Sequence, residues 1–248
     1  MLLRDTWRAM SREILSAGAS PRAPLRGLAT VAASILVILL AGGCGSSAGA
    51  PSPKVARANP AGANPAGAEV ASLLAGIPQR GSTLGDPAAP VTLEYFGDLE
   101  CPICRAFTLQ ALPSLIHRYV RNGKLKIEYR SMRTATPDPE TFEVQQVAAL
   151  AAGKQDRMWN FIELFYHEQG REDSGYVTEG YLQDLARQVP GLNLIAWVAA
   201  RNDAELANTV TADAQAANGS HLTRTPSFLI ANPHNAAYAG TIAKALEG

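Results

Sequence analysis

The spacing of apolar residues predicts a strand, a helix and a second strand around the middle of the chain. Residues 91–96 have the β-branched and aromatic residues of a strand, and residues 125–130 alternate apolar with charged positions, as a half-exposed strand does. Between them, apolar residues recur at helical spacing as far as Gly123, which ends the helix, and Pro113 is expected to kink it. The pattern predicts a β-α-β unit with parallel strands.

The second half of the chain predicts a block of helices followed by a hairpin. Helical spacing of apolar residues continues over about residues 138–219. Residues 225–230 then predict a strand, the turn at residues 232–235 leads to a short return strand around Tyr238, and residues 242–246 predict a last helix. The fold class is therefore α/β, with a β-α-β half and a β-β-α half separated by an inserted helical subdomain.

The first 44 residues have the pattern of an export signal. Several arginines precede the uncharged residues 28–43, whose apolar centre reads VAASILVILL. Residues 40–44, Leu-Ala-Gly-Gly-Cys, resemble a bacterial lipobox, in which the cysteine, here Cys44, is the site of lipid attachment. An uncleaved membrane anchor and plain secretion remain alternatives. Both the lipid-attached form and the uncleaved anchor put the domain on the extracytoplasmic face of the cell membrane, because the arginines favour a cytoplasmic N-terminus.

The composition changes sharply after the export signal. Residues 45–68 consist largely of Gly, Ala, Ser, Pro and Asn and contain two tandem copies of ANPAG, so they predict a disordered spacer that cannot bury a core. A short helix over residues 69–75 and a Gly- and Pro-rich connection over residues 76–90 follow. The folded domain is expected to span residues 69–248.

The charge balance gives no indication of a nucleic-acid partner or of an anionic membrane surface. The 248 residues contain 22 Lys and Arg and 22 Asp and Glu, which gives a formal net charge of zero. Nucleic-acid binding and adsorption to an anionic membrane surface both depend on an excess of positive charge. We therefore expect no nucleic-acid partner, and candidate partners follow from the chemistry of the side chains.

That chemistry centres on a pair of cysteines. Only three cysteines occur, and Cys101 and Cys104 are separated by two residues, after a predicted strand and at the start of a predicted helix. Free backbone N–H groups at a helix N-terminus stabilise a thiolate there. We expect Cys101 to attack and Cys104 to resolve: the oxidised pair accepts a substrate thiolate at Cys101, and the substrate's second thiol then releases the enzyme as a dithiol.

Other uses of a Cys-x-x-Cys pair fit the sequence less well. Zinc needs four ligands, and the chain has no second cysteine pair. The four histidines are scattered: His117, His167, His221 and His234. Covalent haem attachment requires a histidine where Arg105 stands. A purely structural disulfide would close a very small loop, worth only about 2 kcal/mol. We expect no metal and no cofactor.

Residues 96–104, FGDLECPIC, resemble the active-site motif of the DsbA-like thioredoxin-fold thiol-disulfide oxidoreductases. Thr225 and Pro226, before an apolar strand, are similar to the cis-proline loop of that family. The resemblance covers about residues 76–248 and includes the helical insertion. It implies a thioredoxin-like fold in which Pro226 is cis and faces Cys101, and in which Thr225 offers backbone hydrogen bonds to an extended substrate segment. An ordinary turn at Thr225-Pro226 is the alternative.

The sequence departs from the family's pattern at two positions. Tyr95 stands six residues before the first cysteine, where the family often has a buried carboxylate that moves the proton of the inner thiol. Glu94 is one residue away and belongs to the other face of the strand. Arg224 stands where the family commonly has glycine. We expect Arg224 to be solvated; stabilising the thiolate of Cys101 is its alternative role.

The resemblance and the export signal together imply an enzyme that forms disulfides in exported proteins and is reoxidised by a membrane redox partner. The dipeptide Pro102-Ile103 offers no polar group to the thiolate, which favours an oxidant of intermediate strength. A disulfide reductase or isomerase at the same site remains the alternative. From a different class, a thiol-based Cu(I)-binding module or a peptide-binding module also remains.

Overall fold

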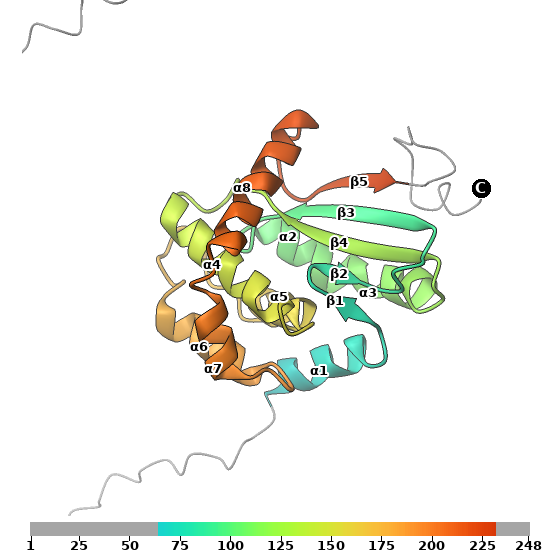
Figure 1. Ribbon diagram of the computed structural model, residues 1–248, viewed down its shortest axis with the longest axis horizontal. Coiled ribbons are helices and arrows are strands. Elements are labelled where there is room, and N and C mark those ends of the chain that lie inside the picture. Colours follow the sequence, from blue (N-terminus) through green and yellow to red (C-terminus); the bar gives the residue numbers. More distant parts are fainter. Residues whose placement is uncertain (1–63, 232–248) are drawn as a thin grey trace, which may run out of the picture. The chain divides into compact units, whose positions relative to one another are not determined.

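The computed structural model describes residues 64–231, and in this part of the chain five strands form one mixed sheet with helices packed around it (Figure 1). The strands are β1 (Gln79–Arg80), β2 (Thr83–Leu84), β3 (Val91–Gly97), β4 (Leu125–Ser131) and β5 (Ser227–Ala231). Their order across the sheet is β1-β2-β4-β3-β5. The pairing of β3 with β4 is parallel, and the pairings of β5 with β3 and of β2 with β4 are antiparallel.

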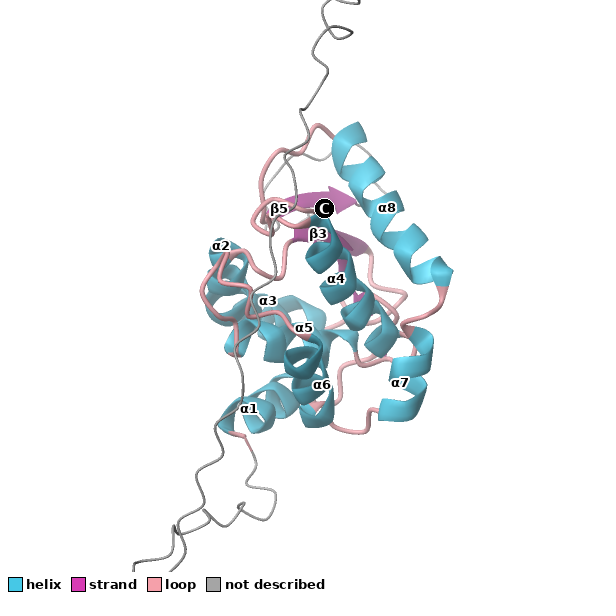
Figure 2. Ribbon diagram, turned by 90° about the vertical axis from the view of Figure 1, so that its left-hand side faces the viewer, coloured by secondary structure: helices cyan, strands magenta, loops and turns pink. Residues whose placement is uncertain are grey.

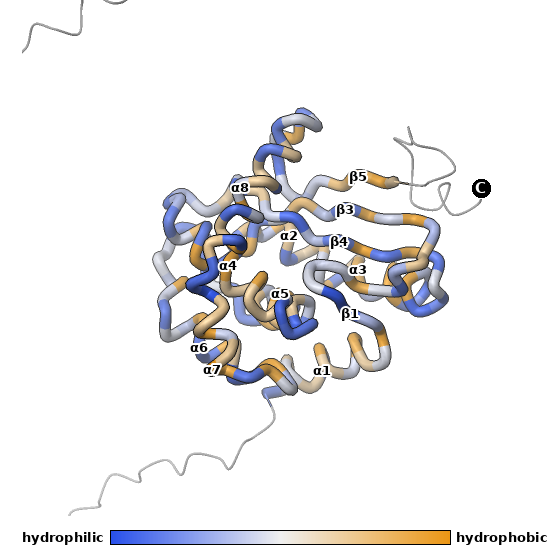
Figure 3. Tube along the Cα trace, viewed as in Figure 1, coloured by the Kyte–Doolittle hydropathy of each residue, from blue (hydrophilic) through white to orange (hydrophobic). Residues whose placement is uncertain are grey.

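The alternation of apolar residues explains the position of β3 and β4 in the sheet. Along β4, the apolar residues Leu125, Ile127 and Tyr129 are buried, whereas the charged residues between them are half-buried. Figure 3 colours the chain, including β3 and β4, by hydropathy. In β3, Leu93 and Tyr95 are also fully buried. The strand predicted over residues 91–96 and its parallel partner are therefore confirmed.

One long helical segment connects β3 to β4, and it changes its hydrogen-bonding pattern along its length. It consists of α2 (Pro102–Ala106), the π-helical turn η1 (Phe107–Ala111), α3 (Leu112–Leu115) and the π-helical turn η2 (Ile116–Val120). Pro113 has no N–H to donate, and it lies in the short α3 between the two wide turns. The segment is thus π-helical on both sides of α3, and the kink expected at Pro113 stays a prediction. Gly123, with φ of +65°, follows the segment.

The predicted helical insertion is present. Its helices are α4 (Pro139–Gly153), α5 (Met158–His167), α6 (Glu179–Gln188), α7 (Leu194–Ala200) and α8 (Ala204–Gly219). Side-chain caps begin four of them, such as Asp138, which accepts the N–H of Thr141 at 2.7 Å. The aromatic residues Trp159 and Trp197 are fully buried. In both views α6 and α7 lie at the end remote from β5 (Figures 1 and 2).

Two local expectations were wrong. Helix α1 (Pro65–Leu74) begins four residues before the expected residue 69, because Asn64 caps it and Pro65 occupies its first turn. The last residues assigned to the spacer are therefore helical. The connection over residues 76–90 contains the hairpin β1–β2, whose pairing depends on contact of β2 with β4 rather than on a local apolar pattern.

Several expectations concern residues outside the described part of the chain. These are the export signal and Cys44, most of the spacer, the return strand around Tyr238 and the last helix over residues 242–246. Within residues 64–231, every helix is too short or too polar to cross a membrane.

Candidate active site

Cys101 lies at the N-terminus of α2, as the sequence predicts. It is the N-cap residue, with extended backbone angles (φ −71°, ψ 119°), and Pro102 follows at the first helical position. The backbone N–H of Cys104 donates to the Cys101 sulfur at 3.3 Å. The side chain of Gln169 fixes the preceding loop by donating to the carbonyl groups of Leu99 (2.7 Å) and Cys101 (3.2 Å). The start of the helix thus holds the sulfur, and the insertion holds the backbone of the loop that carries it.

The two thiols are free in this structure, and their pKa values are shifted in opposite directions. Hydrogen bonding with Cys104 is the largest cause that lowers the pKa of Cys101 to about 6; burial opposes it, and the Thr225 side chain and helix N–H groups add to it. Burial is the main cause that raises the pKa of Cys104, which is fully buried. At neutral pH the arrangement favours a thiolate at Cys101 and a thiol at Cys104.

The loop before β5 brings Thr225 and Pro226 to the cysteine pair. The peptide bond between them is cis, as the family resemblance implies. The thiol of Cys101 donates to the carbonyl oxygen of Thr225 at 3.6 Å, and Thr225 itself is buried. The hydroxyl groups of Thr225 and Thr134 hydrogen-bond to each other. The structure thus places the four candidate residues from two distant segments side by side.

Tyr95 occupies the position where the family often has a buried carboxylate, and it is surrounded by hydroxyl groups. Its hydroxyl lies 3.3 Å from those of Thr108 and Tyr166, and Tyr166 also donates to the carbonyl of Asp98 at 3.2 Å. Burial raises the pKa of Tyr95 well above its ordinary value. A neutral hydroxyl cluster therefore stands at the position where the family often has a buried carboxylate.

Glu94 and Arg224 are not part of this cluster. Glu94 lies on the other face of β3 and pairs with Arg130 at 2.8 Å. Arg224 is exposed, and residues 64–231 contain no ion pair with it. The exposure of Arg224 agrees with the solvated role expected from the sequence.

Two acidic residues beside Cys101 had no role in the sequence interpretation. Asp98 is fully buried, and its carboxylate accepts five hydrogen bonds, most of them from residues 134–136. Glu100 is 4% exposed, and burial, followed by the charge of Asp98, raises its pKa to about 7. The position of Asp98 between a strand and the cysteine motif was the only sequence signal, since four of its five hydrogen-bond donors lie more than thirty residues away.

Two apolar side chains that are close in the chain to residues of the site are exposed. The side chain of Ile103, between the two cysteines, is 62% exposed, and that of Phe228 in β5 is 37% exposed. Phe228 packs on Phe107 with ring centroids 4.6 Å apart. Exposed apolar side chains beside a reactive thiol can contact the apolar side chains of an unfolded peptide.

The histidines and acidic residues of the described part of the chain are spread over several elements. In residues 64–231, no three His, Cys, Asp or Glu side chains are grouped so that they could hold a metal ion. His117 and His167 line a common pocket of about 320 Å³ beside α1, together with Glu163. His234 lies outside the described residues.

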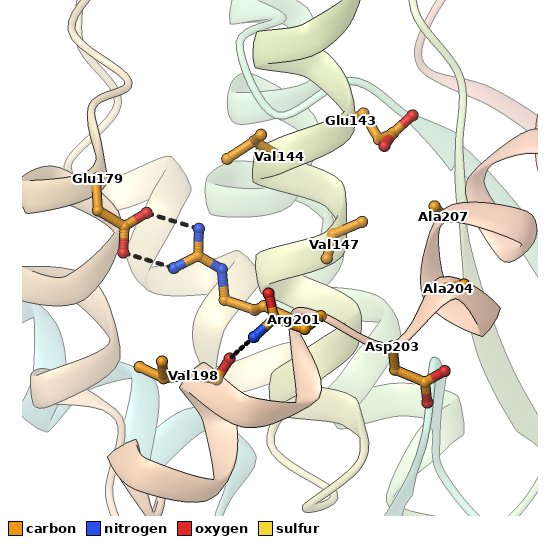
Figure 4. A pocket seen from close by; sticks show the side chains of 10 residues that line it. Glu143, Val144, Val147, Glu179, Val198, Arg201, Asp203, Ala204 and Ala207 are labelled. Atoms are coloured by element: carbon orange, nitrogen blue, oxygen red, sulfur yellow. Dashed lines mark hydrogen bonds and ion pairs between the residues drawn. The ribbon is translucent and has the colours of Figure 1, made fainter.

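A separate pocket of about 450 Å³ lies in the helical insertion (Figure 4). None of the residues that line it belongs to the cysteine motif. Arg201 donates from both terminal nitrogens to the carboxylate of Glu179, each at 2.7 Å, and its guanidinium lies 4.7 Å from the ring centre of Trp197. The pair links α6 to the end of α7. Because the two charges satisfy each other, we interpret them as part of the framework of the insertion.

Comparison with known proteins gives a consistent picture. A family model described as thioredoxin matches residues 79–242. A protein named probable disulfide bond formation protein D from Bacillus cereus is 29% identical over 108 residues, which are 43% of this chain and 49% of that protein. Disulfide bond formation protein D from Bacillus subtilis is 29% identical over 109 residues, 42% of this chain and 46% of that protein. The chain thus spans about half the length of these curated relatives.

Solved structures share the fold. Oxidised BdbD from Bacillus subtilis superposes with a TM-score of 0.58 and 22% identity, covering 69% of this chain and 98% of that chain. The α-DsbA1 of Wolbachia pipientis gives a TM-score of 0.54 at 22% identity, covering 64% of this chain and 78% of that chain. At such identities the superpositions show that the thioredoxin-like fold with its helical insertion, expected from the sequence, is correct.

Proposed function

Because the chain belongs to the thioredoxin family, we propose that it is a protein-disulfide oxidoreductase that forms disulfides through Cys101 and Cys104. The observation that carries the proposal is the unequal pair of thiols: the pKa of Cys101 is lowered to about 6, and that of Cys104 is raised by burial. The names of the curated Bacillus relatives support the same activity.

The reaction begins with the Cys101–Cys104 disulfide. A substrate thiolate attacks the Cys101 sulfur, the S–S bond breaks, and Cys104 leaves and takes up a proton, because burial disfavours its thiolate. The substrate's second thiolate then attacks the substrate sulfur of the mixed disulfide, and Cys101 leaves as a thiolate. Two electrons pass from the substrate dithiol to the enzyme, whose two cysteines end in the reduced, dithiol state.

The low pKa of Cys101 favours oxidation over reduction of the substrate. A hydrogen-bonded thiolate stabilises the reduced enzyme relative to its disulfide, which makes the disulfide a stronger oxidant. Thr225 and Pro226 border the sulfur and are the proposed substrate-binding residues. The exposed Ile103 would contact apolar residues next to the substrate cysteine.

The sequence supports a location for this activity. The uncharged run preceded by arginines, and the lipobox-like residues ending at Cys44, favour a domain tethered to the extracytoplasmic face of the cell membrane. Its substrates would be exported proteins with free thiols, and a membrane redox partner would reoxidise it. Mass spectrometry of the mature N-terminus distinguishes an acylated Cys44 from an uncleaved anchor.

Two cysteine variants test the proposal. Cys101→Ser should abolish oxidation of a dithiol peptide, because the electrophilic sulfur and the disulfide are both lost. Cys104→Ser should instead accumulate mixed disulfides through Cys101, and the proteins trapped in cells should carry export signals. Oxidation that persists in the Cys101→Ser variant would refute the proposed site, and trapped proteins that are cytoplasmic would refute the proposed location.

A further inference from the structure

Asp98 fixes the loop between β4 and α4 beside the cysteine motif. One carboxylate oxygen accepts the backbone N–H groups of Thr134 (2.8 Å), Ala135 (2.8 Å) and Thr136 (3.0 Å). The other accepts the Thr136 hydroxyl at 2.6 Å and the N–H of Glu100 at 3.1 Å. Hydrogen bonds to a buried charge are strong, and four of the five come from this loop and hold it against the end of β3.

The same loop reaches the cysteine pair through one side chain. The Thr134 hydroxyl hydrogen-bonds to the Thr225 hydroxyl, and the Thr225 carbonyl accepts the Cys101 thiol at 3.6 Å. A continuous series of contacts therefore runs from Asp98 through Thr134 and Thr225 to the reactive sulfur. Its members come from three separate segments of the chain.

We propose that Asp98 and Thr134 are positioning residues that orient the Thr225 hydroxyl toward the Cys101–Cys104 sulfur pair. The inference rests on the proposed oxidoreductase function and adds two residues that do not touch the substrate. In the productive arrangement the Thr134 hydroxyl donates to the Thr225 oxygen, and the Thr225 hydroxyl is free to donate to sulfur. A donor oriented in advance costs no reorganisation when charge develops on the sulfur.

The electrostatics of the two thiols supports this arrangement. After hydrogen bonding with Cys104, which is the largest cause, the Thr225 side chain contributes to the lowered pKa of Cys101. For Cys104, where burial dominates and raises the pKa, hydrogen bonding from the Thr225 side chain acts in the opposite direction. If this hydroxyl rotated away from the sulfur, the thiolate of Cys101 would lose a hydrogen bond and the pKa of Cys101 would rise.

Thr134 offers a variant that leaves the fold intact. Thr134 is exposed, and in Thr134→Ala its backbone N–H still donates to Asp98, so the loop keeps its anchor. Thr134→Ser restores the hydroxyl. Thr141→Ala is the control, because it removes a threonine hydroxyl whose hydrogen bond, to the exposed carboxylate of Asp138, lies outside the series of contacts that ends at Cys101.

The experiment measures the thiolate of Cys101 in the reduced full chain by ultraviolet absorbance against pH. In Thr134→Ala the midpoint should rise by about half a unit to one unit, the size of one net hydrogen bond. The equilibrium with glutathione should move severalfold toward the disulfide. Thr134→Ser and Thr141→Ala should match the unchanged chain. An unchanged midpoint in Thr134→Ala, or an equal rise in Thr141→Ala, overturns the proposal.

Asp98→Asn tests whether Asp98 holds the loop between β4 and α4, because the two possible effects shift the midpoint of the Cys101 thiolate in opposite directions. Removing a negative charge near a thiolate would by itself lower the midpoint, whereas releasing the loop should raise it. A rise supports the positioning role of Asp98, and a fall refutes it. The titration needs no substrate, so the two proposals fail separately. If the protein without substitutions does not oxidise dithiol peptides, only the proposed function is refuted. If the midpoint of the Cys101 thiolate is the same in Thr134→Ala, only this inference is refuted.

Discussion

The difference between two neighbouring thiols is the central feature at the scale of single residues. Cys101 accepts hydrogen bonds at the start of α2, and its pKa falls from an ordinary value of 9.0 to about 6. Cys104 is one helical turn further along and fully buried, which raises its pKa. Position relative to the helix start thus separates a nucleophile from a protected thiol.

This difference predicts the pH dependence of alkylation. A pKa lowered in the folded chain means that the thiolate is present above pH 6 and is lost as the pH falls through that value. In the reduced protein, the rate of alkylation of Cys101 by iodoacetamide should therefore follow a midpoint at about pH 6, with Cys104 unmodified at neutral pH. Peptide mapping by mass spectrometry assigns each site. A midpoint near 9, or earlier modification of Cys104, would contradict the geometry.

Local sequence was sufficient for the residues whose role depends on a local motif. The spacing of Cys101 and Cys104 and the pair Thr225-Pro226 pointed to residues that the structure brings together. Asp98 was missed because its partner Thr134 is 36 residues away and carries no motif. A buried charge of this kind is recognised only when the donors around it are known.

At the scale of elements, the periodicity of apolar residues predicted helices and long strands, whereas strands that depend on pairing with a distant segment could not be predicted. The alternation in β4 and the helical spacing of the insertion gave elements that the structure confirms. The β1–β2 hairpin was missed, because its two-residue strands exist only through contact with β4. The start of α1 at Pro65 was missed because an alanine- and proline-rich segment also fits a spacer.

The contact of α1 with α5 contains a buried acid that should make stability depend on pH. Glu163 in α5 is 1% exposed, and one of its carboxylate oxygens has no hydrogen-bond partner in the described part of the chain. Burial, followed by the charge of Glu69 in α1, raises the pKa of Glu163 to about 8. The folded chain therefore holds a proton on this carboxyl that the unfolded chain loses near its ordinary pKa of 4.5.

The sign of the effect follows from the raised pKa. The contribution to the free energy of unfolding is complete below pH 4.5 and declines as the pH rises to about 8. Glu163→Gln should remove this decline and make the protein more stable than the unchanged chain at pH 8, as measured by urea denaturation. The exposed Glu143→Gln variant should retain the original dependence. Identical pH profiles for Glu163→Gln and the unchanged chain would refute the assignment.

At the scale of the whole molecule, the register of the sheet assembles the site. Gly97 at the end of β3 pairs with Ser131 at the end of β4, and Phe96 pairs with Ser227 at the start of β5. The loops that follow β3 and β4 and the loop that precedes β5 therefore meet at one edge of the sheet. The parallel pair was predictable from sequence, but the register that brings Thr134 beside Thr225 depends on the complete fold.

The central claim is that this site donates disulfides, and the reduction potential of the Cys101–Cys104 pair tests it most directly. The protein is equilibrated with glutathione buffers, and the alkylated products are quantified by mass spectrometry. A thiolate stabilised as at Cys101 predicts a potential of about −120 to −180 mV, the range of extracytoplasmic oxidants. A value of about −270 mV or lower would contradict the account and indicate a reductase, and a pair that does not titrate would leave only a binding or structural role.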